Sequence, residues 1–284
     1  MSRYSSRSAF TLIELLIVVA IIALLVGLLL PAINGARKSA KNAVAQSEIA
    51  QIQTAIQVFK TKFNVRYIPA TQPGAATAFR LRKTYTGSEP ELAYLKQVWP
   101  ELPYLVGPTA NGPQYHPNGT GLPDLNLDCN QTMTFFLTGG IATNYQGFSL
   151  DRRQPFTVTA GIDGMPPFLE YNASKFDADG HYLDPWGTPY AYFTAVPGNK
   201  AASWLGIFTW PDQEGNQRIV EPYNEQGTSR KINEKSFQII SAGSDKAFGP
   251  GGAAWTPGTG LYDVDEIGGD DIASFKEGPL VTRE

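Results

Sequence analysis

Residues 236–275 hold a dense group of side chains that could do chemistry. The stretch carries one basic residue, Lys246, and six acidic residues: Asp245, Asp263, Asp265, Glu266, Asp270 and Asp271. Hard cations such as Ca²⁺ take about six to eight oxygen ligands from carboxylates, backbone carbonyls and water. The glycines after Asp245 allow the chain to turn its carbonyls inward. The stretch therefore predicts either a calcium-binding loop or a solvated acidic loop.

A second acidic stretch, Asp177-Ala178-Asp179-Gly180, is similar to the beginning of an EF-hand calcium loop. Such a loop closes with a bidentate glutamate at its twelfth position. Thr188 occupies that place in this chain. We therefore regard this stretch as a weaker metal-site hypothesis than the C-terminal one.

Other catalytic chemistry has little support in the sequence. The two histidines, His116 and His181, do not have a zinc-type spacing, and Cys129 is the single cysteine. The chain contains no phosphate-binding loop, no dinucleotide-binding glycine pattern and no nucleophile-elbow motif. A carboxylate hydrolase would need a paired cleft, which one sequence does not reveal. We expect a protein that is not an enzyme.

The longest apolar stretch is Phe10–Leu30, FTLIELLIVVAIIALLVGLLL, whose one charged residue is Glu14. Its length matches a helix that crosses the hydrocarbon core of a bilayer. A carboxylate near the centre of such a helix costs roughly 2.5–3.5 kcal/mol, and less near an end. Glu14 is therefore either a tolerated charge near the interface or a residue with a specific role.

Residues 9–14, AFTLIE, resemble the processing site of type IV prepilins and type II secretion pseudopilins. The resemblance implies that a prepilin peptidase cuts between Ala9 and Phe10 and methylates the new amine of Phe10. It also implies that Phe10 and Glu14 act in filament assembly. The family usually has glycine where this chain has Ala9. Pro31 matches the family's helix-bending proline, and we expect a bend or a local loss of helix there.

A cleaved signal peptide is the alternative for this segment, but its apolar core would be shorter and followed by a small-residue cleavage site. Basic residues lie on both sides of the apolar stretch, so charge leaves the orientation open. The family resemblance implies that the globular part lies outside the cytoplasm. The net charge of −3 falls to −5 when Arg3 and Arg7 are removed by cleavage, which argues against nucleic acid as a main partner.

Residues 32–63 predict an amphipathic helix, because Ile52, Ile56, Phe59 and Phe63 fall on one face. Residues 69–180 are rich in proline and glycine and predict a large loop-rich insertion facing outward from a filament. Two short helices are expected within it. Ser88 could cap one over Pro90–Val98, and Asp128 or Asn130 could cap another that ends at Gly139-Gly140.

Three segments of the insertion fit the glycosylation sequon Asn-x-Ser/Thr. They begin at Asn118, Asn130 and Asn172. The pattern is short, so chance is the simpler explanation of each occurrence.

Residues 184–190, DPWGTPY, predict a turn followed by a strand. The turn closely resembles one in the type II secretion major pseudopilin, where its role is structural. Further strands are predicted at Leu205–Trp210 and Ser236–Ser241, with antiparallel pairing. The lone Cys129 excludes an intrachain disulfide, which is also typical of the pseudopilin branch.

The major pseudopilin resemblance extends to the C-terminal acidic stretch and implies bound Ca²⁺. Asp245 and the glycines after Pro250 match the family's calcium segment, and Asp270 or Asp271 matches its closing acidic pair. The implied ligands are Asp245, Asp265, Asp270, Asp271 and the carbonyl of Ala242. About a dozen additional residues, 253–262 with their neighbours, separate the glycines from the acidic pair in this chain.

Together these observations predict an α+β fold: a long N-terminal helix packed on a small antiparallel sheet, with a large loop-rich insertion. The expected parts are a leader (1–9), a transmembrane and assembly helix (10–31), an amphipathic helix (32–68), a variable insertion (69–180) and a C-terminal sheet with the acidic loop (181–284).

The predicted function is a structural subunit of a type II secretion pseudopilus. The alternatives are a type IV pilin for adhesion or motility and a membrane-anchored calcium- or glycan-binding module. The resemblance implies the following partners: further copies of the chain, minor pseudopilins or pilins, the prepilin peptidase and the assembly platform of the inner membrane. It also implies a single-pass inner-membrane protein that later joins an extracytoplasmic filament.

Overall fold

The computed structural model describes residues 12–71, 78–82, 85, 87–102, 125–140, 147–153, 155–156, 164–170, 172–196, 204–206, 208–211, 215, 217–225, 228–249, 251, 268–276 and 278–280. The chain divides into two compact units, residues 1–41 and 42–284. Helix α1, Leu12–Phe63, begins in the first unit and ends in the second.

The described part of the first unit is the apolar half of α1. Every residue from Leu12 to Lys41 is exposed, including the large aliphatic side chains. Within the described part of the chain, α1 is the one helix that is long and apolar enough to span a membrane. The helix is continuous through Pro31, so the predicted local loss of helix does not occur there. One missing donor removes a single rung from a hydrogen-bond ladder that extends far on both sides.

In the second unit, α1 is amphipathic as predicted. Ile52, Ile56 and Phe59 are fully buried and Phe63 is half-buried. Glu48 is also buried. Its Oε2 accepts a hydrogen bond from the Tyr190 hydroxyl (2.8 Å), and its Oε1 forms an ion pair with Nζ of Lys175 (2.5 Å). A buried carboxylate is tolerated when it is paired in this way.

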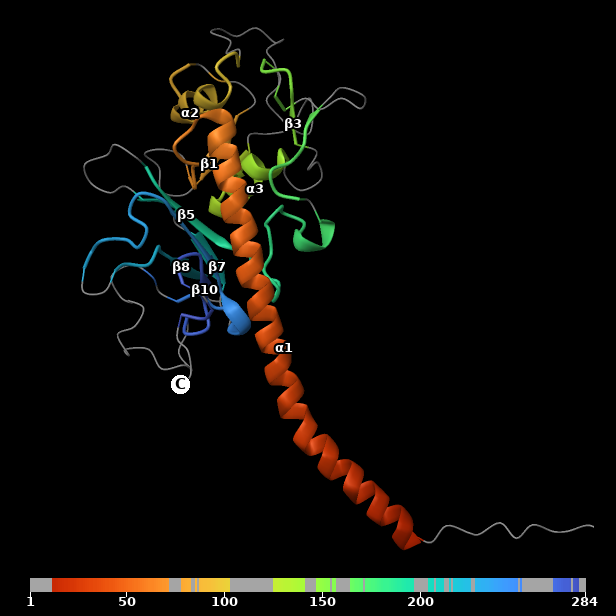
Figure 1. The fold of residues 1–284 in the computed structure, drawn as a ribbon. Coiled ribbons are helices and arrows are strands. Elements are labelled where there is room, and N and C mark those ends of the chain that lie inside the picture. The colour runs from red at the N-terminus through yellow and green to blue at the C-terminus, as the bar shows by residue number, and fades with distance from the viewer. Residues whose placement is uncertain are drawn as a thin grey trace, which may run out of the picture. The chain divides into compact units, whose positions relative to one another are not determined.

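A four-stranded antiparallel sheet lies beside this part of α1 (Figure 1). Its order is β10-β9-β5-β6, with β5 at Ala191–Ala195, β6 at Trp204–Leu205, β9 at Phe237–Ser241 and β10 at Ile272–Ala273. The register pairs Ala191 with Ile240 and Ile272 with Ser241. All residues of β5 and β9 are buried, so both faces of the sheet are covered.

The two faces of the sheet meet different segments. Tyr190 and Tyr192 point to one face, where their hydroxyls reach Glu48 and the carbonyl of Ile68 (2.9 Å). On the other face, the Gln238 side chain of β9 makes two hydrogen bonds to the backbone of Tyr223. Its Oε1 accepts from Tyr223 N (2.8 Å), and its Nε2 donates to the carbonyl of Tyr223 (2.9 Å). The central strands are therefore held by helix α1 and by the chain that leads into β9.

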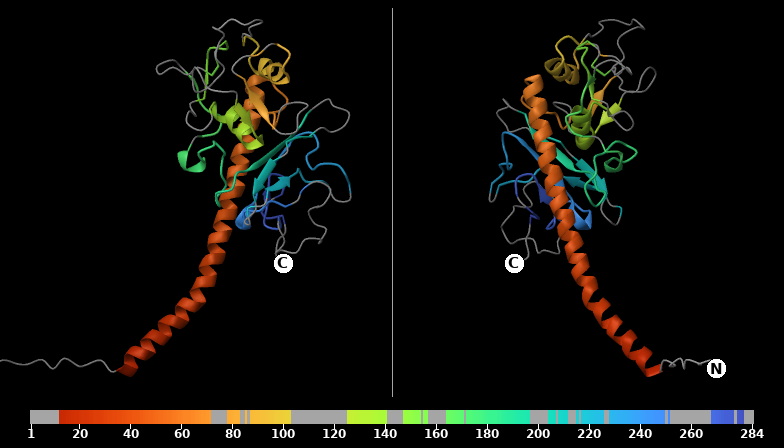
Figure 2. Two further views of the ribbon diagram at one scale, coloured as in Figure 1. Left: turned by 180° about the vertical axis from the view of Figure 1, so that it is seen from behind. Right: turned by 45° about the vertical axis from the view of Figure 1, so that its right-hand side comes forward.

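The remaining described elements are short. They are β1 (Phe79–Leu81), α2 (Pro90–Val98), β2 (Leu125–Leu127), α3 (Cys129–Thr138), β3 (Phe148–Ser149), β4 (Gly164–Met165), η1 (Ala173–Lys175), β7 (Phe208–Pro211), β8 (Gln217–Val220) and η2 (Gly243–Asp245). Strands β1 and β2, β3 and β4, and β7 and β8 form separate antiparallel pairs, which Figure 2 shows from two further directions.

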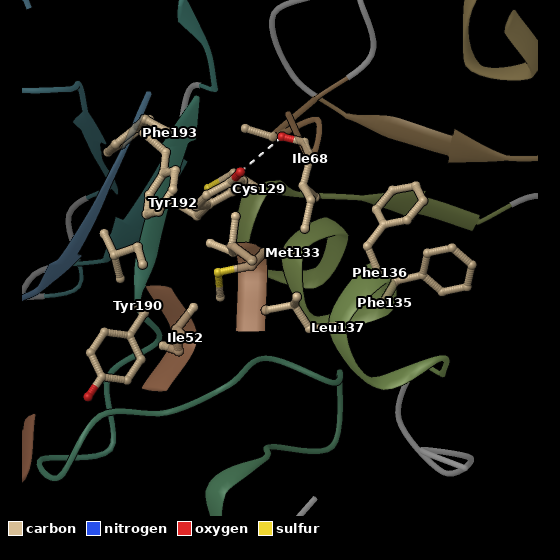
Figure 3. Close-up of a cluster of buried hydrophobic side chains, with 14 of the residues drawn as sticks. Ile52, Ile68, Cys129, Met133, Phe135, Phe136, Leu137, Tyr190, Tyr192 and Phe193 are labelled. Atoms are coloured by element: carbon tan, nitrogen blue, oxygen red, sulfur yellow. Dashed lines mark hydrogen bonds between the residues drawn. The ribbon is translucent and has the colours of Figure 1, made fainter. Parts of the chain in front are cut away.

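Residues 69–180 contribute to the hydrophobic core, because α3 lies within it. Met133, Phe135 and Phe136 are fully buried. Figure 3 shows Met133 beside Ile52 of α1 and Tyr192 of β5, with the hydrogen bond from Tyr192 to Ile68 marked. The predicted insertion therefore holds part of the core as well as surface loops.

The two predicted helices are present, with one correction. Helix α2 has the predicted bounds, but its N-cap is Glu89, which makes no side-chain capping bond, and Ser88 is not the cap. Helix α3 is capped by Asp128, whose side chain accepts from Gln131 N (2.8 Å) in a reciprocal capping box. It ends at Gly139, whose φ of 77° is favourable only for glycine.

The predicted strand over Leu205–Trp210 is divided. Gly206 has a φ of 119° and separates β6 from β7, so the two halves join different sheets. A side chain at Gly206 would also meet the ring of Phe193 at 2.8 Å. Apart from this division, the described residues form the α+β fold that the sequence predicts.

Candidate functional site

The first predicted metal ligands lie where β9 ends. The buried Ala242 precedes the single turn η2, which contains Asp245. Gly243 has a φ of 68°, and a Cβ placed on it would lie 2.4 Å from the carbonyl oxygen of Asp270. Glycine at this position therefore lets η2 pack directly against the acidic pair that comes 25 residues or more later.

Asp270 binds the backbone of η2. Its Oδ2 accepts hydrogen bonds from Ser244 N (2.7 Å), from the Ser244 hydroxyl and from Asp245 N (3.3 Å). Asp245 in turn accepts from Ala247 N (2.9 Å) through its own Oδ1. Two of the predicted ligands thus already organise the turn that follows β9.

Asp271 lies deeper than Asp270 and is fully buried. Its Oδ2 accepts from Gly249 N (3.1 Å) and from the Tyr223 hydroxyl, while Oδ1 has no hydrogen-bond partner among the described residues. Burial raises the pKa of Asp271 well above its usual range, and the nearby carboxylates of Asp245 and Asp270 raise it further. The carboxyl therefore sits in an environment that favours either a proton or a cation.

The donors present are compatible with a hard cation. Oδ1 of the buried Asp271 is a carboxylate oxygen without a partner, and oxygens of this kind are ligands that Ca²⁺ takes. The Asp245 and Asp270 carboxylates are near enough to raise the pKa of Asp271, but among the described residues the group with ligand atoms within 4.8 Å of one another is the one at Asp177, Asp179 and His181. Asp271, Asp270 and Asp245 would be the protein's contribution to holding such an ion. Asp265, the remaining predicted side-chain ligand, lies outside the described residues.

A second carboxylate cluster is centred on His181, which is 8% exposed. Its Nε2 lies 2.8 Å from Oδ2 of Asp128, and its Nδ1 lies 2.8 Å from Oδ2 of Asp177. Burial lowers the pKa of His181, but the hydrogen bonds and charges of Asp128 and Asp177 outweigh it and raise the pKa to about 9. The imidazolium is therefore the internal counter-ion of this cluster and joins the N-terminus of α3 to residues 177–181.

The residues of the weaker metal hypothesis, Asp177 and Asp179, form a tight turn and not the beginning of an EF-hand loop. The ligand atoms of Asp177, Asp179 and His181 lie within 4.8 Å of one another. However, Oδ1 of Asp177 accepts from the backbone of Asp179 (3.0 Å) and His181 (2.9 Å), which closes a tight turn. The chain then turns again at Asp184, so Thr188 does not extend this turn into an EF-hand loop.

The predicted turn at residues 184–190 has a structural role. Oδ1 of Asp184 accepts from Trp186 N and Thr188 N, both at 2.9 Å, and Gly187 has a φ of 85°. Oδ2 of Asp184 accepts from the hydroxyl of Ser241 (2.6 Å), the last residue of β9. The turn therefore fixes the start of β5 against the end of its neighbour, one residue before Ala242.

The predicted processing site, Ala9 and Phe10, lies outside the described residues. Glu14 lies in the first turn of α1 and is exposed. A negative charge in the first turn is favourable to the helix dipole.

Sequence reasoning missed several residues of these clusters. Tyr223 and Ser244 carry no motif, and their roles depend on long-range packing against Asp271 and Asp270. His181 offered a signal, since it comes four residues after Asp177, but its second partner Asp128 is 53 residues away in the chain.

Comparison with known proteins adds one finding. Residues 4–30 match the family model described as the prokaryotic N-terminal methylation motif. No curated protein and no solved structure matches the chain. The motif and the apolar helix that contains most of it support a type IV pilin-like or pseudopilin protein that is processed by prepilin peptidase and fits a membrane anchor.

Proposed function

We propose that this chain is a structural subunit of a type II secretion pseudopilus and has no enzymatic activity. The observation that carries the proposal is the methylation motif over residues 4–30, continued by an exposed apolar helix in residues 12–41. An exposed aliphatic surface of this length needs either lipid or other helices around it. Membrane insertion before assembly and helix packing after it satisfy that requirement in turn.

Two features favour secretion over adhesion. The turn at residues 184–190 and the acidic segment around Asp270 resemble the major pseudopilin, and the lone Cys129 is incompatible with the disulfide of many pilins. A surface pilin for adhesion or motility is the second candidate. The size of residues 69–180 favours it, since long exposed segments are where recognition commonly lies.

We further propose that Ca²⁺ binds the acidic cluster as a structural ion. The support is the unpartnered Oδ1 of the buried Asp271, next to Asp270 and Asp245. A bound cation would relieve the repulsion among the three carboxylates. It would hold β10 and η2 together at the end of β9.

Processing provides the first test of the proposed function. Intact mass and N-terminal sequencing of the membrane-extracted protein should show a chain that begins at methylated Phe10. A mature chain that begins within or after residues 20–40 would instead indicate an ordinary signal peptidase.

Assembly provides the second test. In a filament, the Glu14 carboxylate can pair with the charged amine of Phe10 on a neighbouring subunit, since a charge in an apolar bundle needs such a partner. Glu14→Ala should leave processing and membrane insertion intact and abolish filaments in electron micrographs of sheared cells. Filaments of normal number in this variant would exclude a role for Glu14.

The position of the gene separates the two candidate functions. Co-location with secretion-channel genes would favour a pseudopilin, and co-location with pilus-retraction genes would favour a surface pilin.

A further inference from the structure

Two of the three sequons lie among the described residues, and the structure separates them. Asn130 begins the sequence Asn-Gln-Thr inside α3, and Asn172 begins Asn-Ala-Ser just before η1. Asn118 lies outside the described residues. The sequence pattern is the same at the two described positions, so accessibility and hydrogen bonding must decide between them.

Asn130 cannot accept a glycan in the folded domain. Its side chain is fully buried, and Nδ2 donates to the carbonyls of Tyr182 (3.1 Å) and Tyr190 (2.7 Å). Its Oδ1 accepts from Tyr182 N (2.8 Å). Each polar atom of the amide is therefore used to fix the chain before β5, and a substituent on Nδ2 would have to break both donor contacts.

Asn172 has the opposite surroundings. Asn172, Ala173 and Ser174 are all exposed, and η1 is the green helical turn to the right of α1 in Figure 1. The side-chain oxygen Oδ1 accepts from Ser174 N (3.1 Å) and from the Ser174 hydroxyl (2.9 Å). Both bonds use the oxygen, so neither of them occupies the amide nitrogen Nδ2 of this exposed residue.

This geometry gives the third sequon residue a chemical purpose. The hydroxyl and the backbone N–H of Ser174 both donate to Oδ1, so together they hold the carboxamide of Asn172 in one orientation.

We propose that Asn172 is an N-glycosylation site, modified outside the cytoplasm by a membrane-bound oligosaccharyltransferase. The glycosyl donor is an oligosaccharide linked through its anomeric carbon to a lipid diphosphate. Nδ2 of Asn172 attacks that carbon, an N–C bond forms, and the C–O bond to the diphosphate breaks. The lipid diphosphate leaves with the bonding electron pair, and the proton lost from Nδ2 passes to a base of the transferase. No oxidation or reduction occurs.

The inference rests on the proposed function in one respect: the transferase and the acceptor must be on the same side of the membrane. A glycan at Asn172 would add a polar, bulky group to the face that carries η1, where it would increase the solubility of an assembled filament surface.

The test is glycopeptide mass spectrometry of the full-length protein purified from membranes of its native host. The expected result is a peptide in which Asn172 carries an oligosaccharide, while the peptide that contains Asn130 has its unmodified mass. Asn172→Gln and Ser174→Ala should abolish the modification completely, and Ser174→Thr should retain it because the hydroxyl is kept.

Each outcome is decisive. An Asn172 peptide that is fully unmodified in the wild-type protein would overturn the proposal, as would a modification that survives Ser174→Ala. The N-terminus of the same preparation is sequenced in parallel. Unmodified Asn172 together with methylated Phe10 refutes the glycosylation site alone, whereas a chain without methylated Phe10 shows that the proposed function has failed as well.

Discussion

The two carboxylate clusters of the second unit solve the same electrostatic problem in different ways. At residues 177–181, Asp128 and Asp177 flank a buried imidazole, so the protein supplies its own cation. At the end of β9, Asp270 and Asp271 accept hydrogen bonds from backbone N–H groups and hydroxyls, and Oδ1 of the buried Asp271 has no hydrogen-bond partner among the described residues. A cation supplied by the protein balances the first cluster, whereas a buried carboxylate oxygen is left without a partner in the second.

The difference has consequences for how each cluster responds to its surroundings. The His181 cluster should respond to pH, because its cation can lose a proton, and should be insensitive to calcium. The Asp271 cluster should respond to calcium, because an ion replaces mutual repulsion by attraction. A His181 cluster that responds to calcium, or an Asp271 cluster that does not, would contradict this distinction.

The largest effect is expected from Asp271→Ala. The substitution leaves the Tyr223 hydroxyl and Gly249 N–H without their acceptor in a buried site, and each unsatisfied donor costs about 1–3 kcal/mol. We expect the free energy of unfolding to fall by about 3 kcal/mol, measured by denaturant titration of the full-length protein in detergent. Asp271→Asn keeps an acceptor and should cost less. Equal losses in the two variants would mean that the charge, and not the hydrogen bonds, is what the site requires.

Calcium should give the next largest effect. An ion that binds only the folded state stabilises it by about 2.7 kcal/mol at a hundred times its dissociation constant. The melting temperature of the full-length protein should rise with millimolar CaCl₂ and return with chelator. Asp245→Ala should abolish the rise and Asp177→Ala should leave it intact. An unchanged melting temperature, with no metal found by elemental analysis, would make the C-terminal cluster a solvated acidic loop.

The pH dependence of the His181 cluster comes third. The folded pKa of about 9 lies above the usual 6.5, so the protonated form is the one that folding favours. Its contribution is fully present below pH 6.5 and is lost as the pH rises through 9. After allowance for solvent screening of the two partly exposed carboxylates, we expect a loss on the order of 2 kcal/mol.

Unfolding free energies measured in detergent from pH 6 to pH 10 check this expectation. His181→Gln keeps a hydrogen-bonding side chain without the titration and should give a flatter profile over the same range. A wild-type profile as flat as that of the variant would show that His181 is neutral in the folded protein.

The smallest effect is expected from Asp179→Asn. Asp179 is exposed, and its hydrogen bonds in the turn are made by its backbone: the N–H donates to Oδ1 of Asp177 (3.0 Å) and the carbonyl accepts from Gln131 Nε2 (2.8 Å). We expect a change below about 0.5 kcal/mol in the free energy of unfolding at pH 7. A loss as large as that of Asp177→Asn, measured in parallel, would show that the Asp179 carboxylate stabilises the cluster as much as the Asp177 carboxylate does.

Local patterns predicted the elements that local physics controls. The stripe of Ile52, Ile56 and Phe59, the capping of α3 by Asp128 and the turn at Asp184 each depend on residues close in sequence, and all three are found in the structure. The break at Gly206 was missed because a single glycine inside an apolar run is compatible with a strand until its φ is known.

The clusters could be predicted only in part, for the same reason. Asp270 and Asp271 look equivalent in the sequence, yet one binds the backbone of η2 and the other is sealed in the core with Tyr223. That distinction depends on how β10 pairs with β9, a contact between residues more than 30 positions apart. Likewise, nothing local indicates that His181 would reach back to α3.

The position of Cys129 gives the domain an internal reporter of its own opening. The thiol lies in the first turn of α3 and is fully buried, and burial raises its pKa well above the usual range. A thiol reacts as the thiolate, so the native side chain should be inert toward oxidants and alkylating reagents. In an oxidising compartment, intermolecular cross-links would therefore form only between molecules whose core has opened. The rate at which a maleimide labels Cys129 would measure how often the core of an intact molecule exposes itself to solvent.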